Sequence, residues 1–139
     1  NLRVNSILSY KLSEVPEGVN ITYDVKVPEE LDVDYSDLGV IIGNLIDNSK
    51  HAVSRVLQNN MDAYIDIKLI CHADNIVFII KNNYINTPEA RNIDYYKNHG
   101  RGIGSVRKII KKYDGMYDVK KTEYEYVTSV SVGVRNMRM

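Results

Sequence analysis

The stretch from residue 36 to residue 58 constrains the fold most, because its apolar residues recur at helical spacing over about six turns. Positions i, i+3, i+4 and i+7 lie on one side of a helix, so the stretch predicts a long amphipathic helix with one buried stripe. Asp34 and Ser36 are both candidate N-cap residues. The stripe comprises Leu38, Ile41, Ile42, Leu45, Ile46, Val53 and Val56.

Other parts of the chain alternate apolar and polar residues, which is the period of a strand with one buried face. Two of these alternating segments are separated by residues 73–75 only and predict a hairpin. Helical spacing returns near both ends of the chain. The predicted strands are 20–27, 63–72, 76–80, 116–121 and 124–134, and the further predicted helices are 1–14 and 102–113.

This order of elements, with hairpins and with helices between them, predicts an α+β two-layer sandwich: a mixed sheet with all helices on one face. The second face of the sheet is expected to meet solvent, since charged residues such as Asp66 and Lys68 alternate there with apolar ones. Residues 83–100 follow neither period, and loops of that length in compact domains usually serve as lids or are disordered.

The bulk composition narrows the class of protein. The 139 residues suit a single domain. The 18 basic and 18 acidic residues balance, which gives no argument for a nucleic-acid partner. The single cysteine, Cys71, cannot form an internal disulfide and fits a reducing compartment. Because the chain begins at Asn1 rather than at methionine, we expect it to be part of a longer protein.

Two asparagines interrupt the long helix. Asn is a poor residue inside a helix because its amide competes for backbone hydrogen bonds. Asn44 and Asn48 both fall on one flank of the apolar stripe, and His51 follows one turn later. An amide oxygen at that border could face a ligand or a cation while the helix packs. The alternative is a pair of asparagines that touch loops or solvent, and the pair alone leaves both interpretations open.

The segment GRGIG, residues 100–104, places three glycines at the start of the second amphipathic helix. Glycine lets a ligand approach the backbone, and the free N–H groups at a helix start attract anions. Arg101 adds positive charge. A Rossmann fingerprint needs a strand directly before the glycines, and a P-loop needs G-K-[ST]; neither is present. A glycine-rich helix entry without a ligand is the alternative.

Together, NLIDNSKHAV (44–53), the hairpin, the lid and GRGIG (100–104) resemble the GHKL family of ATPase domains, which includes sensor histidine kinases, DNA gyrase and Hsp90. The resemblance implies a Bergerat-type ATP-binding fold over residues 19–136. It identifies residues 1–18 as the end of a dimerisation helix and a linker, because NSILSYKL (5–12) is similar to that region of Agr-type peptide-sensing kinases.

The resemblance also implies a ligand, Mg²⁺-ATP, and a role for each motif residue. Asn48 and Asn44 would bind the metal and belong to the catalytic group together with Arg101, which would neutralise charge on the transferred phosphoryl. His51 would contact phosphate. The nucleotide-binding set implied by the two motifs is Asn48, His51, Asn82, Gly100, Arg101, Gly102, Ile103 and Gly104.

Asn82 is the main departure from the family pattern. Members of the family carry D-x-G-x-G here, and the aspartate reads the adenine amino group, whereas this chain has KNNYIN (81–86). Strand alternation turns Lys81 outward and Asn82 toward the helices. An amide lacks the charge of the aspartate, so we expect nucleotide binding to be weaker by about 1 kcal/mol and base discrimination to be poorer.

The implied function is the ATP-binding catalytic domain of a two-component sensor histidine kinase. The phosphoacceptor histidine would lie upstream of Asn1, in a homodimer that passes the phosphoryl group to a response regulator. The domain would be cytoplasmic, in a membrane-bound receptor. Asn44 stands where hydrolytic members have a glutamate, so hydrolysis should be slow. A pseudokinase scaffold, an anti-sigma-type serine kinase and an unrelated interaction module are the alternatives.

Overall fold

A computed structural model describes residues 1–86 and 101–134 of the chain, and the side chains of residues 101–103 are not part of that description. Every predicted helix and strand is confirmed, with bounds shifted by a few residues. The elements are α1 (Leu2–Leu12), β1 (Val19–Lys26), α2 (Tyr35–Gln58), β2 (Ala63–His72), β3 (Asn75–Asn83), α4 (Arg101–Lys112), β4 (Met116–Lys121) and β5 (Glu125–Gly133).

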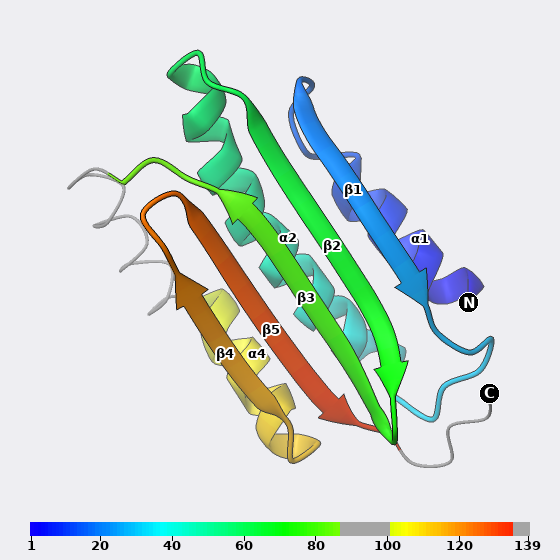
Figure 1. The fold of residues 1–139 in the computed structure, drawn as a ribbon. Coiled ribbons are helices and arrows are strands. Elements are labelled where there is room, and N and C mark those ends of the chain that lie inside the picture. Colours follow the sequence, from blue (N-terminus) through cyan, green and yellow to red (C-terminus); the bar gives the residue numbers. More distant parts are fainter. Residues whose placement is uncertain (87–100, 135–139) are drawn as a thin grey trace.

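The described strands form one mixed sheet in the order β1-β2-β3-β5-β4. The first two strands are parallel, and α2 makes the crossover between them, while the remaining pairs are antiparallel. The helices of the described residues, α1, α2 and α4, cover the same face of this sheet (Figure 1). The predicted two-layer α+β fold is therefore confirmed.

Helix α2 is the centre of the helical layer. Its N-cap is Asp34, whose side chain accepts a hydrogen bond from the backbone N–H of Ser36 at 2.8 Å. This satisfies one of the free N–H groups of the first turn. All seven residues of the predicted apolar stripe are buried, together with Gly43 and Ser49. One polar side chain, Ser49, is thus held inside the stripe.

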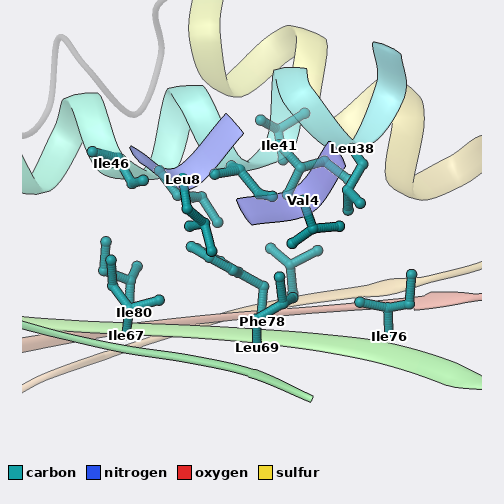
Figure 2. Close-up of a cluster of buried hydrophobic side chains, with 14 of the residues drawn as sticks. Val4, Leu8, Leu38, Ile41, Ile46, Ile67, Leu69, Ile76, Phe78 and Ile80 are labelled. Atoms are coloured by element: carbon teal, nitrogen blue, oxygen red, sulfur yellow. The ribbon is translucent and has the colours of Figure 1, made fainter. Parts of the chain in front are cut away.

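The core lies between the helices and the inner face of the sheet. Figure 2 shows Leu38, Ile41 and Ile46 of α2 above side chains of the central strands. Each large apolar side chain removed from water contributes about 1.5–3 kcal/mol. The side chains below α2 in this layer are Ile67, Leu69, Ile76, Phe78 and Ile80, all buried.

Helix α1 packs on α2 and shares this core. Val4 and Leu8 are buried in it. The two helices meet at the glycines of α2, where a Cβ added at Gly43 would lie at an ordinary contact distance, 3.6 Å, from Cε of Lys11. Lys11 also bridges to Asp47 of α2 at 2.9 Å, and the hydrogen bond to Asp47 raises the pKa of the lysine. The assignment of residues 1–18 to a dimerisation helix stays a prediction.

The strand faces follow the predicted alternation except at the edge of the sheet. Tyr23 has the inward register, opposite Ile67, but is 67% exposed because β1 has a neighbouring strand on one side only. Cys71, near the end of β2, is half-buried and packs against the core. On the outer face Asp66 and Lys68 are exposed, as predicted. None of the helices described is long and apolar enough to cross a membrane.

Candidate functional site

The two asparagines of α2 lie on the half-buried flank of the helix, as the helical wheel predicts. Nδ2 of Asn44 donates to the carbonyl of Val40 at 2.8 Å, so the amide oxygen is the atom left for a ligand. The side chain of Asn48 makes no hydrogen bond within residues 1–86 and 101–134. His51, one turn further on, is exposed.

Asn82 lies on the inner face of β3, as the alternation predicts, and is 4% exposed. Its register partners are Ile65 on β2 and Tyr126 on β5. Its Oδ1 accepts a hydrogen bond of 2.8 Å from the hydroxyl of Ser49, which reaches across from α2. Lys81 points to the opposite face and is half-buried there. Asn82 is therefore a buried polar group joined to the helix that carries Asn48.

A second polar residue near Asn82 was missed by the sequence reasoning. Thr128 is buried on β5 and pairs with Ile80, so it is the diagonal neighbour of Asn82 on the inner face. Diagonal neighbours across antiparallel strands lie about 7–8 Å apart. Ser49, Asn82 and Thr128 are the buried polar residues of the described core. In the predicted strand 124–134, Thr128 alternates in step with the buried residues Val130 and Val132. This alternation could have identified Thr128 as an inward-facing residue.

The glycine segment opens α4. Gly100 lies outside the described residues, and α4 begins at Arg101, so Gly102 and Gly104 fall in its first turn. The N–H groups of a first turn have no partner within the helix. A Cβ added at Gly104 would meet none of the described atoms within 4 Å, so no described residue covers this position of the turn. Arg101 and Ile103, both predicted site residues, are placed only by their backbone.

Helices α2 and α4 run side by side in opposite directions on the same face of the sheet (Figure 1). The start of α2 meets the end of α4, where Nζ of Lys112 lies 2.7 Å from Oδ2 of Asp37. Asn48 is about 16 Å along α2 from that contact and Gly104 about 12 Å along α4, at 1.5 Å per residue. Because the helices are antiparallel, Asn48 and the glycine turn therefore lie at a similar height in the helical layer.

Asp37 links these two helices through more than one contact. Its Oδ2 accepts a second hydrogen bond, of 2.8 Å, from the hydroxyl of Tyr113 directly after α4. The Lys112 ammonium group lowers the pKa of the Asp37 carboxyl, and the Tyr113 hydrogen bond acts in the same direction. Burial together with the Asp37 hydrogen bond raises the pKa of Tyr113. This contact was not predicted, because it joins residues 76 positions apart.

Aromatic side chains anchor the chain where β3 ends and the predicted lid begins. The hydroxyl of Tyr84 donates to the carbonyl of Thr122 at 2.5 Å, and its ring meets that of Tyr126 edge-on at 6.1 Å. Nζ of Lys121 lies 4.9 Å from the centre of the Tyr84 ring. The first residues of the predicted lid, roughly 84–99, are thus tied to the β4–β5 hairpin; the lid beyond residue 86 lies outside the description.

The donor set at this site suits a hard cation held by amide oxygens. Mg²⁺ takes oxygen ligands and keeps several of its waters, so one or two protein oxygens are enough. Asn44, with its nitrogen already bonded, and Asn48 offer such oxygens. No group of three or more His, Cys, Asp or Glu residues that could hold a metal ion occurs in the part of the chain described.

Comparison with solved structures supports the architecture. The catalytic domain of the histidine kinase ThkA, in a nucleotide-free form, superposes with a TM-score of 0.69 at 13% identity, over 94% of this chain and 92% of that one. The histidine kinase domain of the Erythrobacter litoralis EL346 blue-light activated kinase gives 0.68 at 11% identity, over 96% of this chain and 58% of that one. Acinetobacter baumannii AdeS, also a histidine kinase, gives 0.65 at 15% identity, over 97% and 64%.

At such identities these likenesses show the fold alone. No curated protein sequence matches the chain. The family model of the GHKL domain matches residues 33–133, which include the asparagine helix, the β2–β3 hairpin and the glycine turn. This match spans well over half of the chain, and the chain therefore belongs to the GHKL family of ATP-binding domains.

Proposed function

We propose that this chain is the catalytic domain of a sensor histidine kinase, which transfers the γ-phosphoryl group of ATP to a histidine on a separate dimerisation helix. The observation that supports the proposal is that α2, which carries Asn48, and α4, which begins at the glycine turn, are antiparallel neighbours on one face of the sheet. The histidine kinase domains among the similar structures support the same assignment.

In this proposal α2 binds the metal ion and the start of α4 binds the phosphates of ATP. Asn48 and Asn44 would hold a Mg²⁺ ion through their amide oxygens, and the ion would neutralise part of the phosphate charge. The free N–H groups at the start of α4, at Gly102 and Gly104, receive the phosphate oxygens. Arg101 adds positive charge near the transferred group, where it would stabilise the transition state.

Asn82 would read the base, because it is a buried polar group on the sheet that bonds to α2, and Thr128 is its diagonal neighbour. His51 is exposed on the ATP-site helix and is proposed to contact phosphate rather than to accept the phosphoryl group. The acceptor histidine, the homodimer that presents it and the response regulator that receives the phosphoryl group next belong to the proposal. So does the attachment of the domain to a membrane-bound receptor.

The direct test is a thermal-shift titration with ATP, ADP and GTP, with and without Mg²⁺. A ligand that binds only the folded state raises its stability by RT ln(1 + [L]/Kd), so a nucleotide site must raise the Tm. We expect Asn48→Ala to abolish the magnesium-dependent part of the ATP shift. The matched control is Asn5→Ala, an exposed asparagine of α1 far from the site, which should leave the shift unchanged.

The second candidate function is a pseudokinase scaffold. Asn82 favours it, because the family pattern has an aspartate at this position to bind the adenine amino group. Phosphoryl transfer separates the two. The chain fused to a dimerisation helix bearing a histidine should become labelled by γ-³²P-ATP, and Asn48→Ala should prevent labelling. Nucleotide binding without any labelling of the fusion would favour the scaffold.

A further inference from the structure

The amide of Asn82 is held by two hydrogen bonds of different character. Its Oδ1 accepts from the hydroxyl of Ser49 at 2.8 Å. Its Nδ2 donates to the backbone carbonyl of Asn83 at 3.0 Å. One partner comes from α2 and the other from the strand itself, so both ends of the amide are engaged before any ligand arrives.

The second of these bonds decides which way round the amide lies. A serine hydroxyl can donate or accept, so Ser49 alone would tolerate either orientation. The carbonyl of Asn83 only accepts, so the group 3.0 Å from it must be the NH₂. A flipped amide would put two oxygens against each other at that distance. The Asn82 oxygen therefore faces Ser49, and the Ser49 hydroxyl is its donor.

We propose that Ser49 and the Asn83 carbonyl fix Asn82 as a hydrogen-bond acceptor, so that the site selects a 6-amino purine over a 6-oxo purine without a carboxylate. The inference rests on the proposed function, since it takes Asn82 as the residue that reads the base. An amide oxygen has two acceptor positions, and Ser49 occupies one. The second can accept from the amino group of adenine, whereas the carbonyl of guanine would meet it oxygen to oxygen.

The proposal departs from the expectation of poor base discrimination, because the two hydrogen bonds of the Asn82 amide oppose its flipping. It also predicts that an aspartate would not improve the site. In Asn82→Asp, a carboxylate oxygen would replace the NH₂ and face the Asn83 carbonyl, where it could only repel. The neutral amide is therefore the side chain that fits this backbone, and Ser49 is the residue that positions it.

The experiment is calorimetric titration of the whole chain with Mg²⁺-ATP and Mg²⁺-GTP. We expect the wild type to favour ATP at least about tenfold, the cost of an unpaired buried acceptor. Ser49→Ala should lower ATP affinity about fivefold and reduce the ATP-to-GTP ratio. Ser54→Ala is the matched control, because its hydroxyl bonds only to the Lys50 carbonyl on the same helix. Asn82→Asp should bind ATP no more tightly than the wild type.

Equal affinity of the wild type for ATP and GTP would overturn the proposal, as would an unchanged ratio in Ser49→Ala or tighter ATP binding by Asn82→Asp. If no nucleotide binds at all, the proposed function fails and base selection fails with it. The orientation of the amide is then judged separately by NMR without nucleotide. The Asn82 NH₂ protons should exchange slowly with solvent in the wild type and Ser54→Ala and faster in Ser49→Ala, and equal exchange in all three would refute the positioning role.

Discussion

Asp37 and Lys112, 75 residues apart in the chain, form an ion pair of 2.7 Å that joins the start of α2 to the end of α4. The pair lies at the end of the helical layer away from the asparagine flank. It joins the two helices that carry the candidate site through a carboxylate that also accepts a hydrogen bond from Tyr113. The free energy of unfolding at acid pH should therefore depend on this contact.

The first prediction concerns the acid side of the stability profile. The pKa of Asp37 is lowered below its ordinary value of 3.8, chiefly by the hydrogen bond from Lys112. A carboxyl whose folded pKa is depressed stabilises the folded state above the unfolded pKa, and this contribution is lost as the pH falls through the folded pKa. Urea unfolding from pH 6 to pH 2 should show that loss in the wild type, and Asp37→Asn should remove it while lowering stability at pH 6.

The control for Asp37 is Asp24→Asn, an exposed aspartate whose nearest cation, Lys26, lies 3.9 Å away. It should leave both the stability at pH 6 and the acid profile close to those of the wild type, because exposed ion pairs contribute little. If Asp37→Asn and Asp24→Asn behaved alike at every pH, the contact would have no role in joining the two helices.

The second prediction concerns alkaline pH. Burial, together with the hydrogen bond to Glu125, raises the pKa of Tyr64 from 10.0 to about 12. A group whose folded pKa is raised stabilises the folded state below the unfolded pKa, so this contribution is lost as the pH rises from 10 to 12. The difference in unfolding free energy between the wild type and Tyr64→Phe should shrink over that interval. Tyr10→Phe, at an exposed tyrosine, should give a difference that does not change with pH.

The residues that the sequence reasoning placed correctly are those whose position follows from a local period. A period of 3.6 puts Asn44 and Asn48 on one flank of α2, and a period of 2 turns Asn82 inward, because backbone geometry alone decides both. The β2–β3 and β4–β5 pairs follow from the two predicted hairpins, whereas the β3–β5 pair joins segments far apart in the chain and was not predicted. These rules need no knowledge of distant contacts.

What the sequence reasoning missed depends on how the elements meet. The Ser49 hydroxyl bonds to Asn82 because α2 packs over β3 at this point. The hydrogen bond between Tyr113 and Asp37 forms because α4 packs antiparallel to α2. Tyr23 has the inward parity but sits on an edge strand, where nothing covers it. Periodicity carries no information about the approach of one element to another.

The third prediction tests why hydrolysis should be slow in this chain. Asn44 cannot take a proton from water, whereas a carboxylate at the same place could act as a general base. We expect Asn44→Glu to raise ATP hydrolysis by the chain at least about tenfold, since positioned bases contribute about a hundredfold or more. Asn44→Gln lengthens the side chain equally without adding a base and should hydrolyse ATP as slowly as the wild type. A rapid wild-type ATPase would contradict the role given to Asn44.

The last prediction asks whether α1 is an integral part of the folded unit. Leu8 is buried among α2 and sheet residues, so Leu8→Ala removes apolar contacts and leaves a cavity. We expect it to lower the free energy of unfolding by about 2–4 kcal/mol, measured by urea denaturation. Leu2→Ala, on the same helix but 82% exposed, is the matched control and should change stability by less than about 0.5 kcal/mol. Equal, small effects of both substitutions would mean that α1 is detached in solution, and residues 1–18 would then behave as part of a neighbouring helix rather than of the ATP-binding core.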